Sequence, residues 1–198
     1  GTTSPTDRLQ VVGNITNTAN SSFNPVLVGS SGLSCINEAN VNGMYVSGKY
    51  AYVTCQDGIM IVDVSTSSPS LIKSISNVGN DGSVYVSGRY AYITTATTNT
   101  LDIVDVSNIS TASKIGSVST DASPRSAVVS GRYAYVVSRT GNSIQSFDVS
   151  DPRNPKPVSS VSTGSGSNPQ AIYAVGGYAY VGNNTGKSFQ IYDISNPS

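Results

Sequence analysis

The residues that most enzymes use for catalysis are scarce in this chain. Its 198 residues include no histidine, a single glutamate, Glu38, and two cysteines. The lack of imidazole excludes a Ser-His-Asp triad, a Cys-His pair and histidine-containing zinc sites. Two cysteines are too few for a Cys₄ zinc site, and no glycine-rich phosphate loop lies between a strand and a helix. We therefore expect no catalytic residues and no resident metal or other cofactor.

Four of the ten aspartates and most tyrosines of the chain recur at fixed places. Each recurring Asp closes an apolar run and is followed two residues later by Ser, an arrangement that usually caps backbone N–H groups of a turn. The recurring tyrosines are expected to pack between repeats. These structural positions are Asp63, Asp105, Asp148 and Asp193, with Tyr50, Tyr90, Tyr133 and Tyr178.

Polar residues that do not recur are better candidates for a binding site, because sites on repeat scaffolds lie on loops. We expect such residues to gather at one rim of the fold, where oxygen-rich loops suit a sugar, a protein or a Ca²⁺ ion. Ordinary solvated loops are the alternative. The candidates are Glu38, Asn40, Asp57, Asp81, Asp121, Arg125, Arg139, Asn168 and Asn183.

One phrase that recurs along the chain identifies the elements that must position these residues. The phrase Val-Ser-Gly-Lys-Tyr-Ala-Tyr-Val of residues 46–53 returns at 86–93 and 129–136, with a more divergent copy at 174–181. A second phrase of the type Ile-Val-Asp-Val-Ser follows each copy, at 61–65, 103–107, 146–150 and 191–195. Repeats every 40 to 45 residues indicate one supersecondary unit stacked on copies of itself.

Each repeat has the pattern of short strands and tight turns. Apolar β-branched and aromatic residues alternate with a period of two, and Gly, Ser, Asn and Asp separate the runs. In the second repeat the expected strands are Leu71–Ser76, Ser83–Ser87, Tyr90–Thr95 and Leu101–Ser107. Four antiparallel strands at this period predict an all-β chain built as a β-propeller-type array of four-stranded blades. A parallel solenoid has shorter rungs, and a sandwich does not repeat its strands at a fixed period.

The two phrases together resemble the LVIVD repeat, which forms propellers in bacterial and archaeal surface or secreted proteins. The match is closest at Leu101-Asp102-Ile103-Val104-Asp105-Val106-Ser107-Asn108, and Asp151-Pro152-Arg153-Asn154-Pro155 carries the linker pattern. The resemblance covers about residues 24–198 and implies the fold. It implies no particular activity, because the family shares no common one.

The array is expected to contain about four repeats plus two N-terminal strands. Residues 1–23 form an N-terminal segment with a partial-blade strand at 8–17, and residues 24–198 divide into units near 24–66, 67–109, 110–151 and 152–198. The opening residues resemble the last two strands of a blade, and the closing residues resemble the first three. Three arrangements are compatible with this count: a fragment of a longer propeller, a small ring with one redundant strand, and strand pairing with a neighbouring subunit.

Composition favours an extracellular or cell-surface protein. Eleven basic and eleven acidic residues leave no net charge and no basic cluster for nucleic acid, and no apolar run is long enough to span a membrane. Cys35 and Cys55 are predicted to form a disulfide across a 20-residue span, with two unpaired thiols as the alternative. Glycosylation sequons begin at Asn14, Asn20, Asn108 and Asn183, although chance alone accounts for them equally well.

These observations lead to one expectation of function and two alternatives. We expect a non-catalytic binding or structural module that recognises a protein or glycan at the propeller rim. The first alternative is a subunit of a filament or surface layer, joined by strand exchange through incomplete terminal blades. The second is a carbohydrate-active enzyme that uses rim carboxylates, which the single glutamate and missing histidines disfavour.

Overall fold

The computed structural model describes residues 27–30, 35, 40–56, 58–78 and 82–197. These residues form four antiparallel sheets, each made from consecutive strands. Blade 1 contains β1 (Val41–Ser47), β2 (Tyr50–Cys55), β3 (Gly58–Asp63) and β4 (Ser70–Ser76). Blade 2 contains β5 (Val84–Ser87), β6 (Tyr90–Thr95), β7 (Thr100–Asp105) and β8 (Ser113–Ser119). Blade 3 contains β9 (Pro124–Ser130), β10 (Tyr133–Ser138), β11 (Ser143–Asp148) and β12 (Lys156–Ser162), and blade 4 contains β13 (Pro169–Val175), β14 (Tyr178–Asn183) and β15 (Phe189–Asp193).

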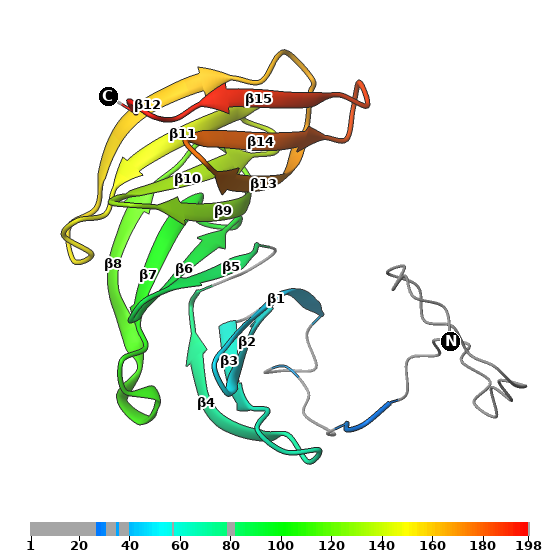
Figure 1. Ribbon diagram of the computed structural model, residues 1–198, viewed down its shortest axis with the longest axis vertical. Helices are drawn as coiled ribbons and strands as arrows, with labels where there is room; N and C mark the ends of the chain where they lie inside the picture. The colour runs from blue at the N-terminus through cyan, green and yellow to red at the C-terminus, as the bar shows by residue number, and fades with distance from the viewer. Residues whose placement is uncertain (1–26, 31–34, 36–39, 57, 79–81, 198) are drawn as a thin grey trace, which may run out of the picture.

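The blades follow one another along an open arc (Figure 1). The first strands of the blades, β1, β5, β9 and β13, lie along its inner side, while β4, β8 and β12 lie along its outer side. A single-turn 3₁₀ helix, η2 (Ile109–Thr111), is the only helical element in the described residues. The all-β propeller-type array predicted from the sequence is therefore confirmed.

The grouping of strands into blades differs from the sequence-based expectation. The segment Leu71–Ser76 was predicted to begin the second blade, but β4 pairs with β3 and completes the first. Each blade therefore runs from its inner strand to its outer strand, and the repeats start later than the predicted units at 24, 67, 110 and 152. A repeat period fixes the length of the unit but not the strand at which it begins. The predicted strand at 8–17 lies outside the described residues.

The turns explain why the recurring Ser-Gly-basic phrase forms a hairpin. Gly48, Gly88 and Gly131 have φ values of 59°, 58° and 60°, which glycine adopts without steric cost. In the fourth hairpin, Gly176 and Gly177 both have positive φ. This copy is not shortened, because Val175 pairs with Tyr178 across a two-residue turn just as Ser47 pairs with Tyr50; it differs in having Gly177 where the others have Lys or Arg.

The core lies between neighbouring sheets. Tyr52, Ile59 and Ile61 of blade 1 pack with Val84 and Val86 of blade 2, and all five side chains are buried. Equivalent residues make the next two interfaces between blades. Blades 2 and 3 thus each bury one face against the preceding blade and the other against the following blade.

The four recurring aspartates cap the turn after the third strand of each blade. In every copy the Asp Oδ1 atom accepts a hydrogen bond from the backbone N–H of the Ser two residues later, at 2.9 Å. In blades 1 to 3 the same carboxylate also pairs with the basic residue of the preceding hairpin, in the pairs Lys49–Asp63, Arg89–Asp105 and Arg132–Asp148. Each basic group also lies 5.2 to 5.7 Å from the centroid of the tyrosine ring that follows it.

The hydrogen bonds and the ion pair around the capping aspartate in each of blades 1 to 3 lower the pKa of its carboxylate. Hydrogen bonds from Ser150, together with the Arg132 guanidinium, lower the pKa of Asp148 to about 2. The pKa of Asp193 is also lowered, by its hydrogen bonds from Ser195. Gly176 and Gly177 occupy the hairpin that faces Asp193, so no basic residue stands there.

The Cys35–Cys55 disulfide is present, as predicted, with the two Cα atoms 5.8 Å apart. Both cysteines are buried beside Ala51, Met60 and Val62. The bond ties the segment before β1 to the end of β2, and closing a span of this length contributes roughly 3 kcal/mol in the chain-entropy model.

We expect Arg132→Ala to raise the pKa of Asp148 toward its usual value of 3.8 and to leave the pKa of Asp193 unchanged. Because the folded-state pKa of Asp148 is depressed, this carboxylate stabilises the fold above about pH 4, and that contribution is lost as the pH falls toward 2. Carbon-13 NMR titration of both carboxylates in one sample measures the shift. An unchanged Asp148 pKa in the variant would show that the Ser150 hydrogen bonds alone lower it.

Candidate functional site

The loops that carry the predicted rim candidates lie at one end of the blades. Pro124 at the start of β9 pairs with Ser138 at the end of β10, and Pro169 pairs with Asn183 in blade 4. The loops that enter the first strands and those that leave the second strands therefore share this end, which we call the rim. Glu38, Asp57 and Asp81 lie outside the described residues, as do the sequons at Asn14 and Asn20.

Asp121 is held by the strands of blade 3. Its carboxylate accepts hydrogen bonds from Ser143 Oγ at 2.5 Å and Ser160 Oγ at 3.2 Å. Its backbone N–H donates to Gln145 Oε1 at 2.7 Å. These bonds fix the loop between blades 2 and 3 on the next sheet, so the observed role of Asp121 is structural.

Asn142, which the sequence analysis did not select, joins blade 3 to the loop that enters blade 4. Its Oδ1 atom accepts hydrogen bonds from the backbone N–H of Asn168 at 2.9 Å and from Ser167 Oγ at 3.3 Å. Asn99 does the same one blade earlier, where its Oδ1 accepts from the Ser123 N–H at 2.8 Å. Both asparagines follow the second strand of their blade and have positive φ, 50° and 54°. This recurrence is the signal that would have identified Asn142.

The remaining candidates are distributed over three blades. Arg125 in β9 and Arg139 after β10 are half-buried, and the Arg139 N–H donates to the Ser123 carbonyl at 2.8 Å. Asn40 is exposed just before β1. Asn168 Oδ1 accepts from Gln170 Nε2 at 2.7 Å. Within the described ranges, no three Asp, Glu, His or Cys side chains gather where they would share a metal ion.

The two described sequons differ in accessibility. Asn183 is buried, and its amide nitrogen, the atom to which a glycan attaches, donates to Ser188 Oγ and Gln190 Oε1 at 2.9 and 2.8 Å. Asn108 is exposed, and its Oδ1 caps η2 through the N–H of Ser110. Of these two asparagines, only Asn108 presents its side chain to solvent.

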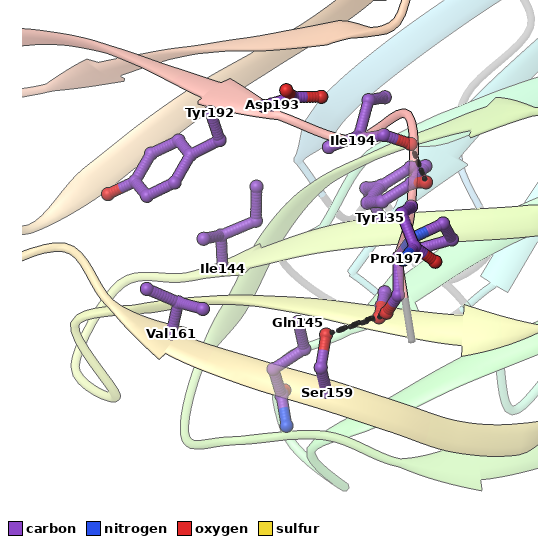
Figure 2. A pocket seen from close by; sticks show the side chains of 11 residues that line it. Tyr135, Ile144, Gln145, Ser159, Val161, Tyr192, Asp193, Ile194 and Pro197 are labelled. Carbon is purple, nitrogen blue, oxygen red and sulfur yellow. Dashed lines mark hydrogen bonds between the residues drawn. The ribbon is translucent and has the colours of Figure 1, made fainter.

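A cleft of about 190 Å³ opens between blades 3 and 4 (Figure 2). Its walls combine apolar and aromatic side chains with polar groups at one end. Tyr135 O–H donates to the Ile194 carbonyl at 3.4 Å, and Ser159 Oγ donates to the Pro197 carbonyl at 3.2 Å. The lining residues are Tyr135, Ile144, Gln145, Ser146, Ser159, Val161, Tyr192, Asp193, Ile194, Asn196 and Pro197.

The cleft lies beside the place where blade 4 differs from the others. Blades 1 to 3 each have a fourth strand, whereas the described part of blade 4 has three. Val161, which lines the cleft, is 50% exposed, whereas its counterpart Val118 in blade 2 is partly buried against the core. The three closing strands, β13 to β15, are predicted by the sequence, whereas the cleft has no counterpart in the sequence pattern.

One face of blade 4 is apolar and open. Phe189 and Ile191 are 65% and 57% exposed, although their counterparts Ile59 and Ile61 in blade 1 are fully buried. The exposed face also carries Tyr173, Val175 and Tyr178 on β13 and β14. We call this face, the adjoining cleft and the outer edge of β15 the open end.

We expect Asn142→Gly to lower the free energy of unfolding by roughly 1–2 kcal/mol, because the glycine tolerates the positive φ but removes the bonds to Asn168 and Ser167. Asn142→Ala should cost about 1 kcal/mol more, since alanine disfavours this conformation. Urea unfolding of both variants checks the order. Asn142→Asp, which keeps the acceptor, is the control, and an Asn142→Gly variant as stable as the wild type would contradict the assignment.

Comparison with solved structures supports the propeller-type fold. The computationally designed Ika4 protein aligns with a TM-score of 0.64 and 11% identity, covering 79% of this chain and 92% of Ika4. A putative 6-phosphogluconolactonase from Bacteroides uniformis aligns with a TM-score of 0.69 and 16% identity over 79% of this chain and 54% of that one. Kuenenia stuttgartiensis hydrazine synthase aligns with a TM-score of 0.64 and 17% identity over 84% and 49%. The chain thus spans about half the length of the latter two, and at these identities the likeness concerns the fold alone.

No curated protein sequence matches the chain. The family model of the LVIVD repeat matches it four times, over residues 40–77, 78–120, 123–163 and 167–198. These matches begin near the first strand of each blade and together cover most of the chain, as the sheets do. The chain belongs to the LVIVD-repeat family.

Proposed function

We propose that this LVIVD-repeat propeller module is extracellular and non-catalytic, and that it works by binding protein at its open end. The observation that carries the proposal is the exposure of Phe189 and Ile191 on a face whose counterparts are buried in every preceding blade. Apolar surface of this kind marks an interaction site in a folded protein.

Two features of blade 4 suit a protein partner. In the described residues β15 pairs only with β14, so its outer edge offers backbone N–H and C=O groups for strand addition. The cleft beside that edge accepts side chains of the added strand between Val161, Ile144 and Tyr192 (Figure 2).

The contacts at the rim support a non-catalytic role. Asp121 accepts hydrogen bonds from two serine hydroxyls, and Asn142 and Asn168 bond across the boundary between blades. Groups used in this way hold the scaffold together. The runner-up, a carbohydrate-active enzyme, requires two carboxylates directed at one sugar ring.

The proposed location rests on the disulfide and the surface. Cys35–Cys55 is the kind of bond that persists in oxidising compartments and is rare in the cytosol. Only 11% of the residues are charged, and Ser, Thr, Asn and Gly fill the loops. No helix in the described residues is long and apolar enough to cross a membrane.

A peptide with the sequence of β8, Ser113–Ser119, tests binding at the open end, because β8 is the fourth strand of its own blade. We expect the fluorescently labelled peptide to bind single copies of the chain and to slow amide hydrogen exchange at Phe189–Asp193. Exchange at Lys156–Ser162 serves as the internal control, and a scrambled peptide as the second. Equal exchange at Phe189–Asp193 with both peptides would overturn binding by strand addition.

Fractionation of the source cells tests the location. We expect an antibody against the chain to detect it in the medium or at the cell surface, with both cysteines resistant to alkylation until a reductant is added. Recovery in the cytosol with both thiols free would contradict the proposal.

A further inference from the structure

A recurring backbone contact marks the boundary between successive blades. In β8, a Cβ atom added to Gly116 would lie only 2.0 Å from the carbonyl oxygen of Pro152, in the loop after the third strand of blade 3. At the same position of β12, Ser159 Oγ donates to the carbonyl of Pro197 in blade 4. Pro152 and Pro197 each stand four residues after the capping Asp of their blade. The outer strand of one blade therefore touches the next blade at a fixed point.

Gly29 makes this same contact with blade 1. A Cβ atom on Gly29 would lie 2.2 Å from the carbonyl oxygen of Ser67, which stands four residues after the capping Asp63. The surrounding sequence matches as well, because Val28-Gly29-Ser30 parallels Ile115-Gly116-Ser117. The segment Leu27–Ser30 thus occupies the position of the outer strand of a blade that precedes blade 1.

Of the four described blades, only blade 4, at the other end of the arc, shows no such strand. Figure 1 shows Leu27–Ser30 beside blade 1 and β15 at the far end of the molecule, so the segment does not reach its own β15. Leu27 and Val28 are 79% and 82% exposed. Among the described residues, the segment therefore has the position of an outer strand but no strand lies between it and blade 1, whereas β15 has no outer strand beside it.

The exposed faces of blades 1 and 4 are complementary, because their counterparts pack against each other in the interface between blades 1 and 2. On blade 1, Met44 and Val46 are 65% and 54% exposed, whereas their counterparts Val84 and Val86 in blade 2 are both 6% exposed. In the interface between blades 1 and 2, these valines pack with Ile59 and Ile61, the counterparts of Phe189 and Ile191. By analogy with that interface, the open face of blade 4 fits the face of blade 1 that carries Met44 and Val46.

We propose that two copies of the chain close a ring, in which the open end of each copy receives blade 1 and the segment Leu27–Ser30 of the other. The segment lies beside β15 as the fourth strand of blade 4 and covers the cleft. The four described sheets of each copy give such a ring eight blades, within the usual range of about four to eight. A head-to-tail contact that closes in this way gives a discrete ring instead of a filament. This inference rests on the proposed function and names the partner of the open end.

Native mass spectrometry tests the stoichiometry. We expect a species of twice the chain mass of 20.4 kDa. Phe189→Asp and Gly29→Val should each raise the dimer dissociation constant roughly 30-fold or more, the first by charging the open face and the second by blocking the approach to Ser67. Ile72→Asp, at an exposed position in the bulge of β4, is the matched control and should leave the dimer intact. A monomer, or a ladder of open oligomers, would overturn the ring.

Disulfide trapping tests the register. Ser117 pairs with Asp102 and Ser160 pairs with Gln145, so the repeat places Ser30 opposite Gln190. A chain carrying Ser30→Cys and Gln190→Cys should oxidise to a covalent dimer, whereas Leu27→Cys with Gln190→Cys should not. An intramolecular cross-link would overturn the proposal, because the segment would then pair with its own β15.

The peptide experiment separates the ring from the proposed function. If the chain is monomeric but the β8 peptide still protects Phe189–Asp193, the ring fails and the proposed function stands. If the peptide also gives no protection, both fail.

Discussion

The structure depends on the burial of one apolar sheet face against the next. A four-stranded blade has two apolar faces and cannot bury either of them alone, so its stability comes from its neighbours. Ile59 and Ile61 are fully buried in a cluster to which the next blade contributes Val84 and Val86. Three such interfaces hold the described blades in an arc, and the same requirement leaves the outward faces of blades 1 and 4 incompletely covered.

Polar contacts fix how the apolar faces meet, and they act at both ends of each blade. At one end, the capping aspartate joins the third strand to the preceding hairpin through a basic residue, as in Arg132–Asp148. At the rim, Asn142 holds the loop that enters blade 4. Asp121 and Asn168, which the sequence offers as binding residues, take part in hydrogen bonds of this kind and so help to hold the blades together.

The sequence and the structure agree best where an interaction is local. The capping role of Asp148 depends on a serine two residues away, and the Cys35–Cys55 bond joins segments close in sequence, so spacing was sufficient to predict both. The grouping of β4 with the following blade was wrong because a repeat read along the chain has no preferred starting strand. Asn142 was missed because its partner, Asn168, belongs to the next blade, and the contact exists only after two sheets have packed.

By itself, the sequence determined the blade: its strands, its hairpin glycines, its capping aspartates and the number of times it occurs. Alternation and turn chemistry act over a few residues, so they can be read from the order of amino acids alone. Only the tertiary structure decided which strand begins each blade, that the rim residues bond to one another, and that Phe189 and Ile191 remain exposed. It also decided that Gly29 lies against Ser67 as the outer strand of a preceding blade. These features depend on which sheet lies beside which, and that arrangement is set by the packing of faces whose residues are 40 or more positions apart.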